Sequence, residues 1–281
     1  MIQPLLQDDA FLADVLDAHA HPHDLHLWWL GQSGFLVQWQ GHHLLLDPYL
    51  SDSLTRKYAA TDKPHVRMTA RVIAPERLDF IEVVASSHNH TDHLDPETLG
   101  PVLRANPKLQ LVAPEANRDF VAERLGVTRE FPRGLVASES KRFGVFEITA
   151  VPAAHPTLER DEQGRHKFLG YVIRCGGFRI YHSGDTLRYD GMAKRLAPFR
   201  VDVALLPING ELPERRVAGN LNGREAATVA KEIGAGVVIP CHYEMFEFNT
   251  ASPEDFLRVA GELKQPCCVL RAGERWSSRS E

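Results

Sequence analysis

The sequence has few cysteines and no cysteine pattern that binds a metal. Four occur in 281 residues, none forms a C-x-x-C pair, and two of them, Cys267 and Cys268, are adjacent. This distribution excludes a disulfide framework and a cysteine-rich zinc site. A reducing, cytoplasmic location is therefore expected.

Long apolar runs and an excess of basic residues are also missing. No stretch approaches the roughly 20 apolar residues that span a membrane. The opening segment, "MIQPLLQDDAFLADVLDAHA", has acidic residues early and no basic region, unlike a signal peptide. A formal net charge of -5 does not favour nucleic acid as a partner. We expect a small-molecule substrate, no nucleic acid and no membrane span.

No short repeat, low-complexity segment or linker divides the chain, so we predict a single domain over residues 1–281. The first part favours a helix and then β-structure, because apolar residues follow a helical period and then fall into short runs between glycines. The expected elements are a helix at about 8–18, strands at 25–30, 34–40 and 42–47, and a long insertion loop at about 49–78.

From residue 79 onward, strand and helix patterns alternate. Asp95 followed by Pro96 is typical of a helix start, and Asn222 with Glu225 resembles a capping box. Two sheets packed together, with helices outside them, account for this order. The predicted strands cover 80–86, 109–113, 145–153, 168–175, 178–183, 201–207, 236–240 and about 268–271, and the helices lie near 96–104, 116–125, 188–197, 224–233 and 253–264.

Potential metal ligands follow four of these strands. The densest group is "HNHTDH" at 88–93, directly after the strand 80–86. The carboxyl ends of strands are where α/β sheets place their chemistry, so these groups are expected to meet. The candidate ligands are His88, His90, Asp92 and His93 after the strand 80–86, His155 after 145–153, Asp185 after 178–183 and His242 after 236–240.

Imidazole and carboxylate groups suit zinc and other first-row divalent ions. In an extended turn His88 and His90 point to the same side and can share one ion. Asp92 and His93 can reach a second ion, and the two oxygens of Asp185 can bridge both. Two ions about 3.5–4 Å apart would hold a hydroxide between them. Asp92 and Asp185 are the candidate catalytic residues, because either carboxylate could hold or relay the proton.

This pattern of H-x-H-x-D-H, a lone histidine, G-D and a late histidine resembles the metallo-β-lactamase superfamily. "WWLGQSGFLV", "LLLDPYL", "YHSGDT" and "VVIPCHYEMF" are similar to the branch that contains L-ascorbate-6-phosphate lactonase and related predicted metal-dependent hydrolases. The resemblance runs from about residue 27 to about residue 256 and is weakest at 49–78 and 157–167.

The resemblance implies a four-layer αββα sandwich of the α/β (α+β) class and two divalent ions, Zn²⁺ or Mn²⁺ with iron as a further option. It also implies a homo-oligomer. By the same resemblance, one ion is held by His88, His90 and His155, the other by Asp92, His93 and His242, with Asp185 bridging and Asp47 supporting the site from behind.

Several other residues have two interpretations. We expect His182 to support the site rather than to bind metal. Asn220 and Asn222, in "NLNG" (220–223), are either a helix cap or a substrate-contacting loop, and Tyr243 is expected to face the pocket. The basic residues of 49–78 are either a solvated surface or an anion site; they are Arg56, Lys57, Arg67 and Arg71. "HAHPH" (19–23) is interpreted as a solvated connector, and Trp28 and Trp29 as packing residues.

The function that the resemblance implies is a dinuclear metal-dependent hydrolase, a lactonase acting on a small, possibly phosphorylated sugar-type lactone through a metal-bridging hydroxide. One alternative is a metal-dependent phosphodiesterase of the phospholipase D-like branch. A lesser alternative is a non-catalytic metal-binding protein. A redox di-iron enzyme is disfavoured, because that class typically has glutamate where this chain has Asn89.

Overall fold

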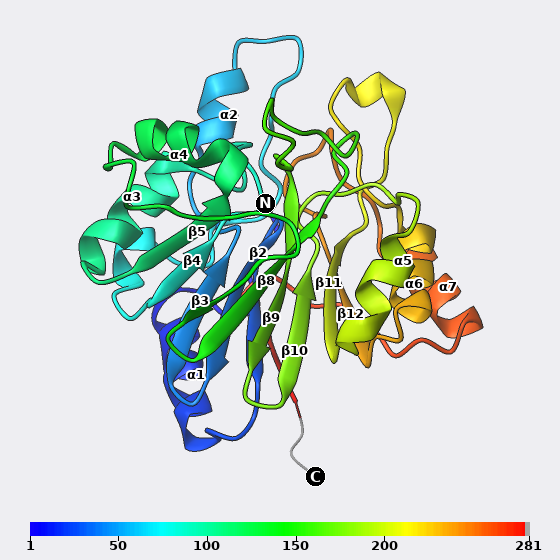
Figure 1. The fold of residues 1–281 in the computed structure, drawn as a ribbon, viewed down its shortest axis with the longest axis horizontal. Coiled ribbons are helices and arrows are strands. Elements are labelled where there is room, and N and C mark those ends of the chain that lie inside the picture. The colour runs from blue at the N-terminus through cyan, green and yellow to red at the C-terminus, as the bar shows by residue number, and fades with distance from the viewer. Residues whose placement is uncertain (279–281) are drawn as a thin grey trace.

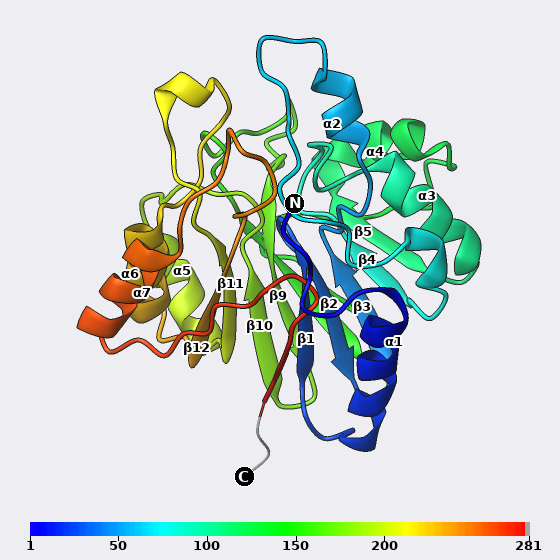
Figure 2. The same cartoon turned by 180° about the vertical axis from the view of Figure 1, so that it is seen from behind.

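The computed structural model describes residues 1–278, and its two mixed β-sheets lie between two groups of helices (Figure 1, Figure 2). Helices α1, α3 and α4 cover the first sheet, and α5, α6 and α7 cover the second. The expected four-layer αββα arrangement is thus confirmed. The helices are α1 (Asp8–Asp17), α2 (Ser53–Tyr58), α3 (Pro96–Ala105), α4 (Arg118–Leu125), α5 (Met192–Leu196), α6 (Gly223–Glu232) and α7 (Glu254–Glu262).

The first sheet has seven strands in the order β13-β1-β2-β3-β4-β5-β6. Strands β3, β4, β5 and β6 run parallel, whereas β1 is antiparallel to both of its neighbours. The bounds are β1 (His26–Gly31), β2 (Gly34–Trp39), β3 (His42–Leu46), β4 (Val83–Ala85), β5 (Gln110–Pro114), β6 (Arg133–Leu135) and β13 (Arg275–Ser277).

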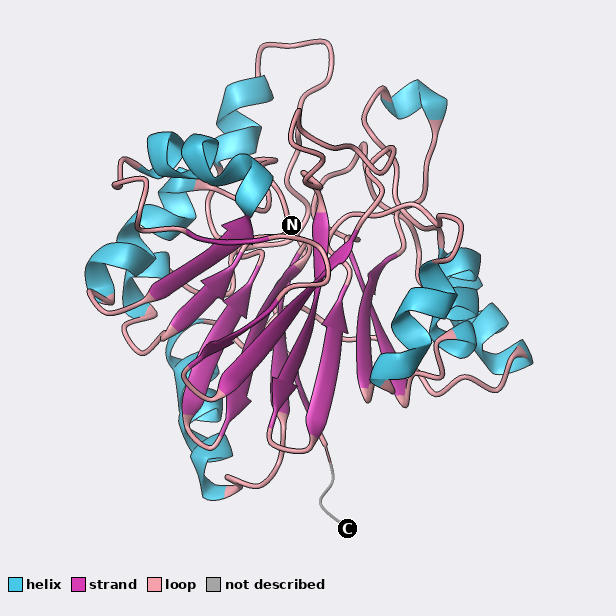
Figure 3. Cartoon of the chain, viewed as in Figure 1, coloured by secondary structure: helices cyan, strands magenta, loops and turns pink. Residues whose placement is uncertain are grey.

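The second sheet has six strands in the order β12-β11-β10-β9-β8-β7, with β10, β11 and β12 parallel. The bounds are β7 (Ser140–Phe143), β8 (Phe146–Pro152), β9 (Leu169–Cys175), β10 (Phe178–His182), β11 (Val203–Pro207) and β12 (Val237–Cys241). Long loops from both sheets gather at one end of the sandwich (Figure 3). The loops that follow β4, β8, β10 and β12 therefore meet at this end of the sandwich.

Several segments differ from the sequence-based expectation. Residues 49–78 are not all loop, because they contain α2 and a short 3₁₀ helix, Pro75–Arg77. Strands β6 and β7 were not predicted. The last strand is β13 rather than residues 268–271, and just before those residues Cys267 forms an isolated bridge with Val238. β13 pairs with β1 from the opposite end of the chain (Figure 2). Local patterns carry no information about such distant pairing.

Both predicted helix caps are confirmed. The side chain of Asp95 accepts hydrogen bonds from the backbone N–H groups of Glu97 and Thr98 at the start of α3. Asn222 and Glu225 form a reciprocal capping box at the start of α6. The cap at Asp95 ends the "HNHTDH" turn and holds it against the first sheet.

Trp28 and Trp29 are buried in the core, as expected. The indole N–H of Trp28 donates to Asp14 Oδ2 at 2.7 Å, and that of Trp29 donates to the carbonyl of Gln32 at 2.9 Å. Residues 19–23, "HAHPH", are exposed and match the solvated connector that was predicted. Within residues 1–278, no helix is long and apolar enough to cross a membrane.

Candidate metal centre

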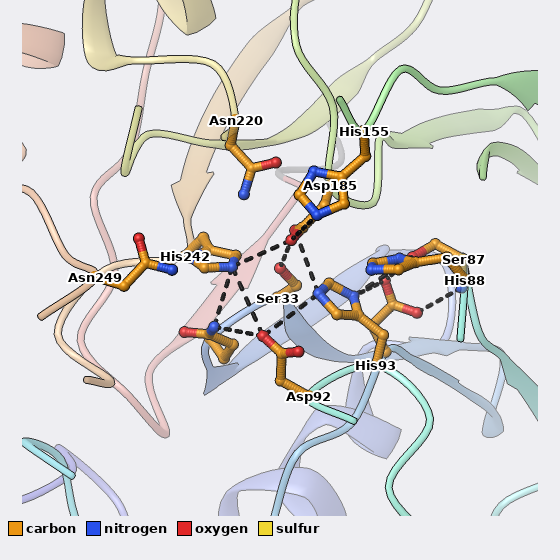
Figure 4. A network of polar contacts seen from close by, with 12 residues as sticks. Ser33, Ser87, His88, Asp92, His93, His155, Asp185, Asn220, His242 and Asn249 are labelled. Carbon is orange, nitrogen blue, oxygen red and sulfur yellow. Dashed lines mark hydrogen bonds and ion pairs between the residues drawn. The ribbon is translucent and has the colours of Figure 1, made fainter. Parts of the chain in front are cut away.

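Two clusters of potential ligands lie where the loops of the two sheets meet. Within each cluster one nitrogen or oxygen atom per residue lies within 4.8 Å of the others. We call them the first cluster and the second cluster. The first cluster is His88, His90 and His155, and the second is Asp92, His93, Asp185 and His242. Figure 4 shows these residues except His90. All seven predicted ligands are therefore brought together, in the two sets that the resemblance implies.

Two histidines of the first cluster, His88 and His155, are held by hydrogen bonds on their Nδ1 atoms. His88 Nδ1 lies 2.9 Å from Ser87 Oγ, and His155 Nδ1 lies 2.9 Å from the carbonyl oxygen of Gly219. Burial, the largest cause, lowers the pKa of His88 well below its usual value and that of His155 to about 4. Both rings are therefore neutral, which is the form that binds a metal through Nε2.

Asp185 lies between the two clusters. Its Oδ1 is 3.3 Å from His93 Nε2, and its Oδ2 is 3.3 Å from His242 Nε2 and 3.7 Å from His155 Nε2. Burial alone would raise the pKa of Asp185, but His93 and His242 lower it well below its usual value. The carboxylate is therefore ionised and in contact with ligands of both clusters.

Asp47 orients His93 of the second cluster through a hydrogen bond to its Nδ1 atom. This fully buried carboxylate accepts hydrogen bonds from Ser87 N at 2.7 Å and Ser87 Oγ at 2.6 Å. Its Oδ2 also lies 2.8 Å from His93 Nδ1 and 2.8 Å from His182 Nε2. His182 therefore contacts Asp47 and belongs to neither ligand cluster.

Gly184, in "YHSGDT", is required by the packing next to Asp185. Its φ of +59° lies in the left-handed region, and an added Cβ would lie 2.5 Å from Ser87 Cβ. Ser87 is the residue that orients both His88 and Asp47. Glycine at this position therefore lets the Asp185 loop approach the "HNHTDH" turn closely.

Tyr243 does not face the site, and for Asn222 the structure shows the helix cap rather than the substrate-contacting loop. Tyr243 stacks on Trp29 with ring centroids 4.3 Å apart, and its hydroxyl donates to the carbonyl of Leu270, so its ring points into the core. Asn222 is exposed and caps α6 instead of facing the metals. Asn220 is buried near His155, and its Nδ2 donates to Asn209 Oδ1 at 3.1 Å (Figure 4).

The sequence did not identify Gln32 as a site residue. This buried glutamine follows Gly31 at a positive φ of 50°. Its Nε2 lies 2.8 Å from Asp92 Oδ2 and 3.0 Å from His242 Nε2, so it links two members of the second cluster. An isolated glutamine in a turn carries no recognisable spacing, although "GQSG" lay within a segment that resembles the family.

Asn249 is a second residue that the sequence did not identify. Its Oδ1 accepts hydrogen bonds from Asn209 Nδ2 at 2.9 Å and from Arg215 Nη1 at 3.1 Å. Two donors on one oxygen orient the amide, and Nδ2 faces His242 (Figure 4). Within residues 1–278 this Nδ2 has no hydrogen-bond acceptor.

A cavity of about 380 Å³ opens onto both clusters, a size that suits a small ligand. Its lining includes metal-cluster residues together with Gln32 and Asn89. It also includes residues of α2, of the segment after α2 and of the segment after His242. Lys57 and Arg124 are the lysine and arginine side chains that line it within the described residues. Asn249 also lines this cavity.

The two clusters fit divalent cations. His88 Nε2 is buried and has no hydrogen-bond partner within residues 1–278. Burial alone would lower the pKa of His93, but nearby carboxylates, above all Asp185 and Asp47, raise it well above its usual value. The same negative potential that favours a proton there favours a metal cation, which would displace that proton.

Comparison with known proteins agrees with this geometry. The family model described as "Beta-lactamase superfamily domain" matches residues 42–243. A UPF0173 metal-dependent hydrolase of Alkaliphilus metalliredigens is 30% identical over 233 residues, which cover 81% of this chain and 89% of the relative. The chain therefore belongs to the β-lactamase superfamily and, within it, to the UPF0173 metal-dependent hydrolases.

A second relative, from Hyperthermus butylicus, has the same description and is 27% identical over 254 residues, 88% of this chain and 96% of its own length. Among solved structures, the isothiocyanate hydrolase from Delia radicum gut bacteria has a TM-score of 0.71 at 20% identity, and the match covers 90% of this chain and 100% of that one. At this identity the likeness shows a shared fold. The family resemblance found from "HNHTDH" and its flanking motifs is confirmed.

Proposed function

We propose that this metal-dependent hydrolase holds two divalent ions and opens a small lactone. The observation that carries the proposal is the position of Asp185, whose two oxygens lie 3.3–3.7 Å from histidines of both clusters. In this proposal His88, His90 and His155 hold one ion, Asp92, His93 and His242 hold the other, and Asp185 contacts both. Zinc, manganese and iron all suit such ligands.

Bound ions of this kind polarise a carbonyl oxygen and lower the pKa of water to near neutrality. In the reaction, the oxygen of water bonds to the lactone carbonyl carbon, the ring C–O bond breaks, and the water proton reaches the departing alkoxide. Asp92 is placed to hold that proton, because its carboxylate lines the cavity and is fixed by Gln32 Nε2 at 2.8 Å. Asp185 is the second candidate for this task.

Asn249 supplies a hydrogen-bond donor next to the second cluster. Its Nδ2 faces the cavity and is directed there by Asn209 and Arg215. A preoriented donor at this place would stabilise negative charge that develops on a substrate oxygen. This role is part of the proposal for lactone opening.

The test combines metal analysis with a substrate panel. We expect about two metals per chain and metal-dependent opening of γ-butyrolactone or a homoserine lactone, with both lost in His88→Ala. His23→Ala is the matched control, because His23 is exposed in the connector 19–23. Faster cleavage of bis-p-nitrophenyl phosphate than of any lactone or acyl ester would favour a phosphodiesterase. Fewer than one metal per chain after metal loading would contradict the dinuclear centre.

Asn249→Ala is expected to lower kcat/KM for the lactone about 10-fold to 100-fold, because it removes one preoriented donor. Asn249→Asp is the informative partner variant, since it keeps an acceptor for Asn209 and Arg215 but has no N–H to donate. Steady-state kinetics should show a comparable loss in both variants, with thermal melting of Asn249→Asp close to the parent. Full activity in Asn249→Asp would exclude the donor role.

A cytoplasmic location and a homo-oligomeric state stay predictions from the sequence and the family resemblance. Size-exclusion chromatography with light scattering measures the second of these directly.

A further inference from the structure

Part of the lining of the cavity is aromatic. It is formed by two segments that are distant in sequence, α2 with the residues after it, and the segment after His242. Apolar and aromatic side chains from both segments line the cavity and touch one another. We call this surface the aromatic wall and define it as Leu54, Tyr58, His65, Phe246 and Phe248.

The rings of the aromatic wall hold one another in place. Tyr58 stacks on His65 with centroids 4.1 Å apart and planes 17° apart, and His65 also contacts Phe248 at 4.4 Å and Phe246 at 5.3 Å. Leu54, His65 and Phe246 are buried, whereas Tyr58 and Phe248 are partly exposed. A bound molecule would therefore meet mainly Tyr58 and Phe248, backed by a packed layer.

The aromatic wall carries no net charge. Burial, the largest cause, lowers the pKa of His65, so its imidazole is neutral near pH 7. His65 Nδ1 lies 3.1 Å from the carbonyl of Lys63, which directs that polar atom away from the other rings. The surface thus suits contact with an apolar group rather than an ionic one.

Most basic residues near this wall are engaged elsewhere. Arg56 pairs with Glu97. Arg67 is largely buried and donates to the carbonyls of Thr69 and Ser51, both at 2.7 Å.

Within the described residues, the lysine and arginine side chains of the cavity lining are Lys57 and Arg124, and each already has a contact with the protein. Lys57 Nζ lies 5.2 Å from the ring centroid of its neighbour Tyr58. Arg124 donates to the carbonyl of Asn89, beside the "HNHTDH" turn, and lies 4.4 Å from the ring of Phe120. Charge-assisted hydrogen bonds from arginine or lysine are the strong contacts of a phosphate group. In the part of the chain that the structure describes, Lys57 and Arg124 are the side chains of this kind in the cavity lining.

We propose that the aromatic wall binds an apolar, preferably flat substituent of the substrate while the reacting carbonyl faces the metal clusters. The substrate class is then an alkyl- or aryl-substituted lactone, and not a phosphorylated sugar lactone. The inference rests on the proposed lactone-opening function and narrows its substrate. Its basis is that metal-cluster residues and a packed set of uncharged rings line the same cavity.

The test compares four lactones: γ-butyrolactone, γ-nonalactone, γ-phenyl-γ-butyrolactone and 6-phosphoglucono-δ-lactone. We expect kcat/KM to rise about tenfold or more from the unsubstituted to the phenyl compound, because a phenyl ring buries apolar area against the wall. Phe248→Ala and Tyr58→Ala should shrink this ratio several-fold, and Tyr58→Phe should retain it. Leu257→Ala, on the exposed face of α7, is the control. A preference for the phosphorylated lactone would overturn the proposal.

A binding measurement separates this inference from the proposed function. Calorimetry should show that the ring-opened product 4-hydroxy-4-phenylbutanoate binds at least about tenfold more tightly than 4-hydroxybutanoate, and that Phe248→Ala removes the difference. If the phenyl compound binds more tightly but no lactone is opened, the proposed lactone-opening reaction is wrong and the aromatic wall is still a binding site. If lactones are opened but phenyl and unsubstituted compounds bind and react alike, the aromatic wall does not bind the substituent, and the proposed reaction is unaffected.

Discussion

Replacement of Asp185 by asparagine is expected to reduce bound metal to one ion per chain or fewer and to lower lactone opening by about 10³-fold or more. The reason is that Asp185 is the one carboxylate of the described chain in contact with ligands of both clusters, through His93, His242 and His155. Asparagine keeps the shape but has no charge and a single acceptor oxygen. It cannot serve both clusters at once.

Metal analysis by mass spectrometry, together with single-substrate kinetics, measures this effect. Asp190→Asn is the matched control, because Asp190 lies five residues further on and is exposed. The substitution at Asp185 should leave the secondary structure intact, since the side chain contacts the cluster histidines and the Ser33 hydroxyl and caps no helix. Retention of two ions per chain in Asp185→Asn would refute its position between two metals.

Removal of the Asp47 carboxylate is expected to have the largest effect on folding. In Asp47→Ala, His93 Nδ1, His182 Nε2 and both donors of Ser87 lose their shared acceptor in a fully buried place. Burial alone would raise the pKa of Asp47, but His93 and His182 lower it, so an ionised group is lost. Breaking a buried ionic network of this kind costs about 3–5 kcal/mol of unfolding free energy.

Denaturant unfolding of chelator-treated protein isolates this effect from metal binding. The midpoint should fall strongly for Asp47→Ala, whereas Asp9→Ala should unfold like the parent, since the Asp9 side chain is 93% exposed. Addition of zinc should raise the midpoint of the parent more than that of Asp47→Ala, because His93 is no longer oriented. Equal midpoints for the parent and Asp47→Ala in the chelated state would show that Asp47 does not stabilise the fold.

The sequence predicted those parts of the fold and of the candidate site that depend on short-range spacing. Alternation of strands and helices after residue 79 predicted two packed sheets, and turns after strands predicted where ligands meet. "HNHTDH" is a compact signal, because four candidate ligands lie within six residues. His155, Asp185 and His242 were recognisable since each follows a strand and matches the family's order.

Residues whose role depends on contacts between distant loops were not predictable. Gln32 and Asn249 are ordinary amides in the sequence, and only the fold places them beside His242. Tyr243 was assigned to the pocket because it follows His242, but the tight turn at that histidine, with φ of +62°, directs Tyr243 into the core. The aromatic wall was not predictable for the same reason, since it joins residues 54–65 to residues 246–248.

The pairing of β13 with β1 has a consequence for synthesis of the protein. His26 and Ser277 are neighbours in the first sheet but lie 251 positions apart in the chain. At about 5–20 residues per second, a ribosome takes roughly 12–50 s to travel between them. Throughout that interval the outer edge of β1 lacks its partner strand, and unpaired edges attract strands of other chains. Pairing of this exposed edge with strands of other chains is therefore the expected hazard while the protein is being synthesised.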